Sequence, residues 1–424
     1  MMMISNKALG ESLRSSPVVR FKDGSYVSDY KVLFVGDTSF GENYQTKYEE
    51  KGLNILKKYG YDHPFQNLKT LLLESDLVIA NLEAPLIDRA NTPPPPFSAS
   101  SAERYVKKKG FWLHWNDVRN APQYLKKYNI RTVSLANNHV LDFGFEGFQQ
   151  TLEALPRNGI RFFGAGYNIK EASKPYVKEI FFGKRILKLV VISAFEYRKD
   201  YDNVFSFYAS SNTSGVNRLS IKTISRQIRR FKEANEDVYI VVYPHWGGTR
   251  SYGTQTNKQV KLGHNLIDAG ADMVIGQGPH SMQQIEKYKG HWIVYTLGNF
   301  IFNSKGQYRK FNAIPFGLAV QLIFKVKEHP SAGFRKNILS ANKIKKALRI
   351  YPVLVDNMVT NYQGRFLNQN ELKLCHRLIA KKNIGMEPIE NDIKSGFDNK
   401  GRGFLEFSLD DFLPVKIGTQ GSMM

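Results

Sequence analysis

Six segments of the chain combine an apolar run with polar residues that can bind a metal or move a proton. They read VLFVGDTSFGENY (32–44), DLVIANLEAPL (76–86), TVSLANNHVLDFG (132–144), YIVVYPHWGG (239–248), ADMVIGQGPHSMQ (271–283) and WIVYTLGNFIF (292–302). Each run stops at a Gly, Asp, Asn or His. Such runs predict strands buried on both faces, and polar groups at the ends of these strands meet at one rim of an α/β sheet. The segments therefore suit a metal site for a phosphate-like group.

The first two segments contribute carboxylates. Asp37 follows a glycine at the end of its apolar run, where a hydrated metal or a phosphate can approach the backbone. Glu83 lies two residues after Asn81, so these side chains share a face if the strand continues. Taken alone, Asp37 also suits the cap of the next helix, and Glu83 also suits a solvated loop.

The third segment is the richest in polar groups. Its strand is followed within six residues by Asn137, Asn138, His139 and Asp142. They offer amide oxygens, an imidazole and a carboxylate, which are ligands or acid-base groups for a hard or borderline divalent cation. The alternative is an Asn-rich turn in which Asp142 caps a helix.

Two further histidines stand at the ends of apolar runs. Taken alone, His245 would be a core histidine and His280, after Gly-Gln-Gly-Pro, would be a turn residue. These separate explanations fail together, because the same coincidence would have to recur at consecutive strand ends. We therefore expect one shared site.

The elements that position these residues alternate along the chain as in an α/β domain. Further apolar stretches at 176–182 and 317–326 suit additional or antiparallel strands. We expect strands at 31–36, 76–80, 131–136, 186–193, 238–243, 272–275 and 292–296, and helices at 65–74, 118–128, 145–159 and 220–235.

Three domain-level divisions follow from composition. Residues 1–30 form a polar lead-in, 31–328 form the main domain, and 329–424 form a basic C-terminal extension. Within the main domain, 88–117 contains four consecutive prolines, which fit neither a helix nor a central strand. We expect this Pro-rich segment to be a surface excursion.

The charge of the chain suggests a polyanionic partner. Its 60 Lys and Arg against 38 Asp and Glu give a net charge of +22, which attracts an anionic polymer, a phosphorylated substrate or phospholipid headgroups. The alternative is a charge that serves solubility alone. The 42% hydrophobic content excludes general disorder, and the chain of 424 residues is long enough to bury a full α/β core.

Compartment and redox chemistry are constrained by what the sequence lacks. The lone Cys375 excludes an intrachain disulfide and a zinc knuckle. No window has the apolar length of a signal peptide core or a membrane span. The default expectation is a cytoplasmic protein, with peripheral contact to a membrane or a biosynthetic complex left open.

The order of these motifs resembles the CapA family of bacterial capsule and poly-γ-glutamate synthesis proteins, in the calcineurin-like metallophosphoesterase superfamily. The similarity rests on GD, NLE, ANNHVLDFG, HWG, GADMVIGQGPH and YTLGNF over about 31–325. It implies an α/β fold, a four-layer α/β/β/α sandwich of the metallo-dependent phosphatase type, with its metal at the strand ends.

The resemblance also assigns roles to residues. Asp142 would orient His139, the catalytic group that protonates a leaving oxygen or stabilises charge. Mixed O and N ligands would favour Mn, Fe or Zn over Mg, as one ion or two. The implied metal ligands are Asp37, Glu83, Asn138, His245 and His280, and the implied substrate or ligand-supporting contacts are Asn81, Asn137, Gln277 and Asn299.

The chain departs from the family pattern in three places. The usual Gly-His-His-Pro-His contains Gln277 and Gly278 instead of two histidines. The glutamate common just after His-Trp-Gly is absent, and Asp37 is followed by Thr38-Ser39 where ordinary phosphoesterases have Asp-x-His. A degenerate or single-metal site therefore stays open.

Two functions compete on this basis. The first is a metal-dependent hydrolase or transferase that acts on a phosphoester or acyl bond during synthesis of a capsule, exopolysaccharide or poly-γ-glutamate. The second is a non-catalytic polymer-binding or assembly subunit with a degenerate metal site. Nucleic-acid binding fits the charge, but the sequence contains no zinc finger, RNP motif or evident helix-turn-helix.

Overall fold

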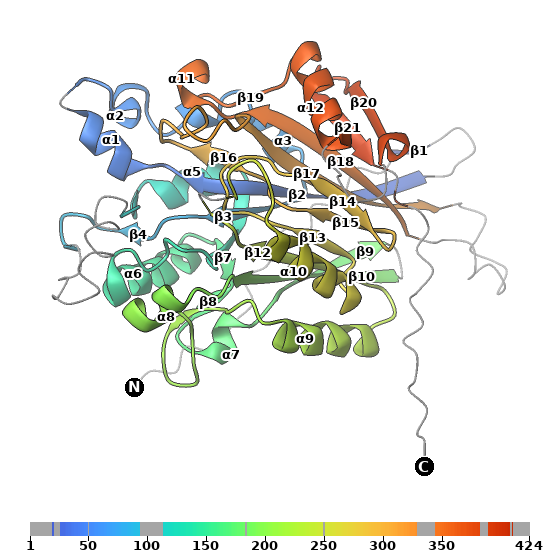
Figure 1. Cartoon of the computed structure of the whole chain (residues 1–424), viewed down its shortest axis with the longest axis horizontal. Coiled ribbons are helices and arrows are strands. Elements are labelled where there is room, and N and C mark those ends of the chain that lie inside the picture. Colours follow the sequence, from blue (N-terminus) through green and yellow to red (C-terminus); the bar gives the residue numbers. More distant parts are fainter. Residues whose placement is uncertain are drawn as a thin grey trace.

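Two β-sheets form the body of the protein (Figure 1). The structure, a computed structural model, describes residues 19–20, 26–49, 51–93, 113–182, 185–248, 251–328, 344–381, 389–407 and 409. Both sheets are of mixed direction, and helices join and flank their strands.

The larger sheet combines a parallel half with an antiparallel half. Within the described residues its strand order is β20-β21-β18-β17-β2-β3-β6-β7; β1 and β16 also pair with β2, and β19 pairs with β18. Pairing is parallel from β2 through β3 and β6 to β7, and antiparallel from β2 through β17, β18 and β21 to β20. Its strands are β1 (Val19–Arg20), β2 (Tyr26–Ser39), β3 (Leu77–Leu82), β6 (Ile130–Ser134), β7 (Arg161–Phe163), β16 (Asn299–Phe302), β17 (Phe316–Glu328), β18 (Lys345–Leu354), β19 (Arg365–Phe366), β20 (Ile393–Phe397) and β21 (Gly403–Phe407).

The smaller sheet has the order β14-β15-β13-β12-β10-β9. Its four central strands are parallel, and antiparallel strands close both edges. These strands are β9 (Tyr176–Phe182), β10 (Arg185–Phe195), β12 (Val238–His245), β13 (Met273–Ile275), β14 (Ile285–Tyr288) and β15 (His291–Val294). Two short pairs complete the strands: β4 (Leu86–Ile87) with β5 (Asn116–Asp117), and β8 (Ala165–Gly166) with β11 (Gly215–Val216).

The helices are short, and none of those described has the length and apolarity that crossing a bilayer requires. They are α1 (Glu42–Glu49), α2 (Ile55–Tyr59), α3 (Lys69–Leu73), α5 (Ala121–Lys127), α6 (Gly144–Arg157), α7 (Ile169–Ala172), α8 (Lys199–Phe205), α9 (Ile221–Ala234), α10 (Asn257–Asp268), α11 (Asn357–Thr360) and α12 (Gln369–Lys381), with 3₁₀ turns at His63–Phe65 and Glu390–Asp392.

Three hydrophobic clusters hold these elements together. One joins residues of both sheets, such as Phe34 and Val320 of the larger sheet with Val241 of the smaller sheet. A second joins the larger sheet to α3, α5 and α6, and a third joins the smaller sheet to α9 and α10. Every residue from Val32 to Val35 is fully buried, as expected for a strand covered on both faces.

The strand positions predicted from the apolar runs are confirmed, including the antiparallel strands β9 and β17. The predicted boundary at residue 328 coincides with the end of β17, but β18, β20 and β21 beyond it extend the larger sheet. Most of the Pro-rich segment, at 94–112, lies outside the described residues, as do 1–18 and 329–343.

A glycine allows the closest approach of two strands at the site. A Cβ at Gly36 would lie 1.9 Å from the carbonyl oxygen of Gly298. The same carbonyl accepts the backbone N–H of Asp37 at 3.0 Å. Because Gly36 has no side chain, β16 pairs with the end of β2, and Asn299 lies opposite Asp37 in the ladder.

Candidate metal centre

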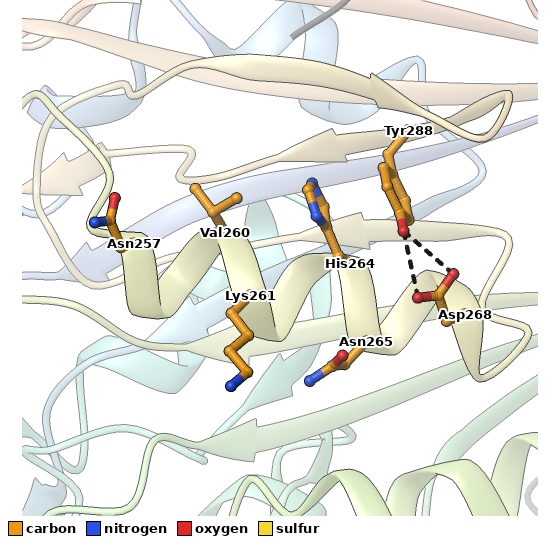
Figure 2. A pocket seen from close by; sticks show the side chains of 7 residues that line it. All are labelled: Asn257, Val260, Lys261, His264, Asn265, Asp268 and Tyr288. Carbon is orange, nitrogen blue, oxygen red and sulfur yellow. Dashed lines mark hydrogen bonds between the residues drawn. The ribbon is translucent and has the colours of Figure 1, made fainter. Parts of the chain in front are cut away.

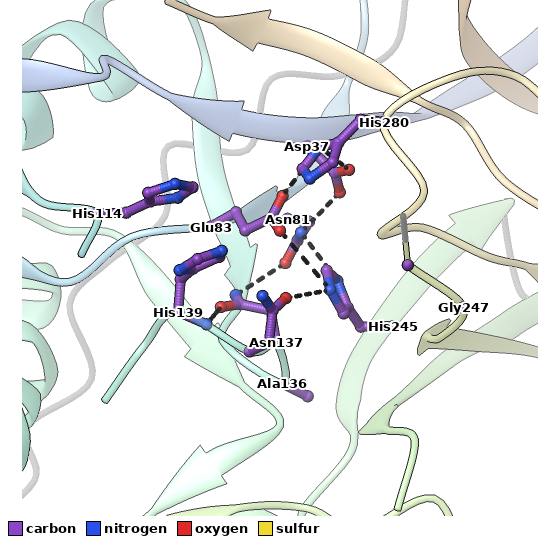
Figure 3. A network of polar contacts seen from close by, with 12 residues as sticks. Asp37, Asn81, Glu83, His114, Ala136, Asn137, His139, His245, Gly247 and His280 are labelled. Atoms are coloured by element: carbon purple, nitrogen blue, oxygen red, sulfur yellow. Dashed lines mark hydrogen bonds and ion pairs between the residues drawn. The ribbon is translucent and has the colours of Figure 1, made fainter. Parts of the chain in front are cut away.

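Three of the predicted ligands meet where strands of the two sheets end (Figure 3). Asp37 lies near the end of β2, Glu83 directly follows β3, and His280 follows β13. One ligand atom from each lies within 4.8 Å of those of the other two. His280 Nδ1 is 3.2 Å from Asp37 Oδ2 and 3.8 Å from Glu83 Oε2. The predicted convergence of these three strand ends is thus confirmed.

The chemistry of these groups suits a cation. Asp37 and Glu83 are fully buried, and among the described residues Asp37 Oδ2 and both Glu83 oxygens have no hydrogen-bond partner. Burial and the adjacent charge of Asp37 raise the pKa of Glu83 well above its ordinary value. Burial acts to raise the pKa of Asp37, but His280, with smaller contributions from His245 and Asn81, outweighs burial, and the pKa is lowered. Two adjacent buried carboxylates, with three of their four oxygens lacking a hydrogen-bond donor among the described residues, are costly unless a cation binds them.

His245 and Asn138 lie on the other side of Glu83. His245 Nε2 is 3.7 Å from Glu83 Oε1 and 2.7 Å from Asn138 Oδ1. Burial lowers the pKa of His245 to about 3, so its imidazole is neutral at physiological pH, the form that binds metals. All five predicted ligands are therefore linked by contacts below 4 Å.

Two asparagines hold the ligand side chains in place through hydrogen bonds. Asn81 donates a hydrogen bond to Asp37 Oδ1 at 2.9 Å and lies 3.3 Å from His245 Nδ1. Asn137 in turn donates to Asn81 Oδ1 at 3.0 Å and to the carbonyl of Leu82 at 2.8 Å. Such partners fix the orientation of ligand side chains, which is the supporting role predicted for Asn81 and Asn137.

His280 is held in an unusual backbone conformation. It has φ of 60°, a left-handed value uncommon for residues other than glycine. Its Nδ1 is 2.9 Å from Asn299 Oδ1, and Asn299 donates to the hydroxyl of Tyr308 at 3.0 Å. Tyr308 also donates to the His280 carbonyl at 3.3 Å. Asn299 and Tyr308 therefore fix His280 toward Asp37.

His139 is separate from the carboxylate cluster and belongs to an aromatic group. Its Nδ1 is 2.6 Å from Asp142 Oδ2, which also accepts the backbone N–H of His114 at 2.8 Å. The His114 and His139 rings stack with centroids 3.6 Å apart, and the Tyr44 hydroxyl is 2.9 Å from His114 Nε2. The expected pairing of His139 with Asp142 is present, whereas His114 and Tyr44 were not predicted. His114 lies in WLHW at the end of the Pro-rich segment, where periodicity gives no signal.

Gln277 and Gly278, which depart from the usual motif, are both tightly enclosed in the structure. Gln277 is fully buried, and neither polar atom of its side chain has a hydrogen-bond partner within the described part of the chain. Gly278 has φ of 113°, and a Cβ there would lie 2.9 Å from His245 Nε2. The backbone around Gly278 therefore leaves no room for the histidine of the usual motif. Gln277 contacts the site through its backbone, which pairs with His245.

A hollow lies on the surface of α10 and is lined by other residues than the metal centre (Figure 2). His264 stacks on Tyr288 there with ring centroids 3.8 Å apart, and its Nε2 is 2.8 Å from Glu286 Oε1. The hydroxyl of Tyr288 reaches Asp268. These polar side chains hydrogen-bond to one another. Within the described residues, the hollow contains no cluster of metal-binding side chains.

The chain is similar to proteins of capsule synthesis. The family described as "Bacterial capsule synthesis protein PGA_cap" matches residues 31–304. "PGA biosynthesis protein CapA" of Bacillus subtilis strain 168 is 29% identical over 271 residues, 64% of this chain and 62% of that protein. "Capsule biosynthesis protein CapA" of Bacillus anthracis is 28% identical over 278 residues, 64% of this chain and 59% of that protein. The chain thus covers less than two thirds of the length of these relatives.

A solved structure gives a weaker match. It is described as "GAP50 the anchor in the inner membrane complex of Plasmodium" and is 10% identical, with 71% of this chain and 84% of that chain covered. The TM-score is 0.29, which supports no conclusion about fold or function.

Proposed function

Because the chain belongs to the PGA_cap family of bacterial capsule synthesis proteins, we propose that it takes part in making, releasing or exporting an anionic extracellular polymer. The relatives named for capsule and PGA biosynthesis support poly-γ-glutamate or a capsular polysaccharide as that polymer. The net charge of +22 suits a polyanionic substrate.

The proposed activity is metal-dependent hydrolysis or transfer at a phosphoester or acyl bond. The observation that carries it is the meeting of Asp37, Glu83 and His280, with buried carboxylate oxygens that lack hydrogen-bond donors among the described residues. Mn, Fe or Zn, as one ion or two, would be held by these three residues with His245 and Asn138. When bound, the metal would polarise a phosphoryl or carbonyl oxygen and lower the pKa of bound water.

The side chains around the ligands have distinct proposed roles. His139, oriented by Asp142 at 2.6 Å, would give a proton to the leaving oxygen. Asn81 and Asn137 would hold Asp37 and His245 in place. Asn299 would hold His280, or contact the substrate at the rim.

The proposed architecture is the four-layer α/β/β/α sandwich of metallo-dependent phosphatases. It is supported by the three hydrophobic clusters, which lie between the two sheets and between each sheet and its helices. This arrangement would place the metal centre at the edge where both sheets end.

An assembly subunit with a degenerate site is the second candidate. Gln277 and Gly278 replace two histidines of the usual motif, and the backbone at Gly278 leaves no space for one of them. A polymer-binding protein would keep the fold and the positive charge without turnover.

Elemental analysis of protein purified without chelator tests the enzyme proposal. The expected result is at least about one equivalent of Mn, Fe or Zn, with hydrolysis of a chromogenic phosphoester or acyl ester that chelation removes. Less than about a tenth of an equivalent, with none taken up on titration, would reject the enzyme and favour the assembly subunit.

A further inference from the structure

Arg198 lies beside the candidate metal centre, on a strand end that sequence analysis did not single out. It follows β10 and precedes α8. Its guanidinium is 5.1 Å from the ring centroid of Phe195, and that ring lies 5.6 Å from the ring of His245. The guanidinium also donates a hydrogen bond to the carbonyl of Gly247, two residues after His245. Figure 3 shows Gly247 next to His245.

Most of the donors of Arg198 are available to a ligand. Arginine has five N–H donors, and within the described residues the Gly247 carbonyl is the one acceptor hydrogen-bonded to the guanidinium. Glu196 Oε2 is 3.9 Å away, and it already accepts the backbone N–H of Gly247 at 3.0 Å, while Glu196 Oε1 pairs with Lys258 at 2.6 Å. The Arg198 side chain is 29% exposed, so it is partly accessible to a ligand from solvent.

The residue at position 248 keeps this space open. Among the described residues, a Cβ at Gly248 would meet Arg198, at 3.4 Å from Nη2. The sequence here reads Gly248-Thr249-Arg250 and contains no carboxylate. A carboxylate at position 248 would pair with Arg198, whereas with glycine there the nearest carboxylate oxygen paired with the guanidinium is that of Glu196 at 3.9 Å.

The charge of Arg198 acts on the metal centre. After burial, which is the dominant cause, Arg198 is among the groups that lower the pKa of His245. It also opposes the upward shift that burial and Asp37 impose on the pKa of Glu83. The positive charge of Arg198 therefore favours anionic groups that approach the metal.

We propose that Arg198 binds an anionic group of the substrate, a carboxylate or a phosphate, next to the metal centre. The planar fork of the guanidinium matches both groups, through two parallel hydrogen bonds. The inference rests on the proposed function for the identity of the site, and it adds a specificity-determining residue from the smaller sheet.

The test compares anion binding by Arg198→Ala, Arg198→Lys and the wild type. Inorganic phosphate and a short glutamate peptide are titrated calorimetrically into the full chain, loaded with Mn²⁺ and metal-free. These two ligands distinguish a phosphate from a carboxylate source. Arg218→Ala is the matched control, because Arg218 is an exposed arginine whose backbone bridges to Phe195 of β10 and whose guanidinium lies 3.8 Å from the Tyr197 ring.

We expect the wild type to bind one of the two ligands, and Arg198→Ala to weaken that binding about tenfold or more. Arg198→Lys should fall between them, because lysine keeps the charge and loses the fork. Metal content and the thermal midpoint should match the wild type in all variants, and Arg218→Ala should bind normally.

Three results would overturn the inference: wild-type protein that binds neither ligand, Arg198→Ala that binds like the wild type, or a loss of binding that tracks a loss of metal in Arg198→Ala. The last would show that Arg198 supports the centre instead of the substrate. Failure of the proposed function is a separate result. A protein that takes up no metal, yet binds phosphate through Arg198, would refute the enzyme and retain this anion site.

Discussion

Asp37 Oδ2 and His280 Nδ1 lie 3.2 Å apart, although Asp37 belongs to the larger sheet and His280 follows a strand of the smaller sheet. The candidate metal centre is therefore built across the junction of the two sheets. Correct packing of one sheet on the other is a condition for assembling the ligands. A bound metal should in turn stabilise that junction, because it binds the folded state alone.

Glu83→Gln should stabilise the metal-free protein and remove its stabilisation by metal. The wild-type carboxylate is buried beside Asp37, and neither of its oxygens has a hydrogen-bond donor among the described residues. A neutral amide removes the free-energy cost of burying or protonating this carboxyl in the folded state, so the thermal midpoint without metal should rise by about 2 °C or more. With Mn²⁺ the wild type should gain stability and the variant should not. A variant that gains as much as the wild type would show that Glu83 is no ligand.

His245→Ala and His139→Ala should have different effects. His245 belongs to the proposed ligand set, so its loss should lower both metal content and activity. His139 pairs with Asp142 instead, so its replacement should leave metal content unchanged and lower the rate about a hundredfold or more. Elemental analysis and the esterase assay measure the two quantities on the same sample. Full metal and full rate in both variants would remove the assigned roles.

Gly36→Ala should disrupt the centre without touching a ligand. The new Cβ would lie 1.9 Å from the Gly298 carbonyl, so β2 and β16 would have to separate. We expect a loss of about 3 kcal/mol or more in unfolding free energy and reduced metal uptake. Gly52→Ala is the control, because Gly52 has φ of 65° and a Cβ added there would meet no atom within 4 Å. The Gly52→Ala variant should lose about 1 kcal/mol of unfolding free energy and keep its metal.

The positions of Asp37, Glu83, His245 and His280 could be predicted because apolar runs mark buried strands, and polar residues that end such runs meet at one rim. Arg198 was missed for a related reason. The run of β10 continues through Phe195 and carries no Gly, Asn or His at its end, so the pattern gave no signal. Its role depends on contacts with Phe195 and Gly247 that only the folded chain reveals.

The C-terminal strands show a second limit of prediction from the sequence. β18 begins with two lysines and contains Arg349, a composition that reads as a basic appendage. In the structure Arg349 pairs with Glu406 of β21 at 2.6 Å, and Ile350 is fully buried against the sheet. The partner that neutralises the charge lies far along the sequence. Local composition therefore could not predict that β18 joins β17.

Glu42 should make stability depend on pH. Burial raises the pKa of its carboxyl from 4.5 to about 8, although the carboxyl accepts hydrogen bonds from the Asp117 backbone and the Tyr61 hydroxyl. The folded state holds the Glu42 proton more tightly than the unfolded state does. The contribution of this proton to the free energy of unfolding is therefore complete below about pH 4.5 and is lost as pH rises toward 8.

Comparing wild type with Glu42→Gln at pH 5 and pH 9 tests this effect. The amide does not titrate and keeps the acceptor oxygen for Asp117 and Tyr61. We expect the unfolding free energy of the wild type to fall relative to the variant by roughly 3 to 5 kcal/mol between these pH values. Parallel pH profiles for the two proteins would show that Glu42 is not buried as a neutral acid.

The exposed basic face of α9 should gather a polyanion. Arg226 and Arg230 lie one helical turn apart and are exposed, whereas Ile224 and Ile228 bury the opposite face. No carboxylate within the described residues pairs with either arginine. Two other basic stretches of the sequence are 105–111, which lies outside the described residues, and 335–346, of which 344–346 are described.

Poly-γ-glutamate binding should therefore weaken steeply between low and physiological salt, because exposed charges are screened over about 8 to 10 Å. Arg226→Gln/Arg230→Gln should weaken low-salt binding about threefold or more without lowering the thermal midpoint. Lys373→Gln/Arg377→Gln on α12 is the matched control, since it removes two exposed charges at the same spacing. It should bind like the wild type. Equal losses from both helices would mean that net charge alone attracts the polymer, and salt-independent binding would exclude an electrostatic role for α9.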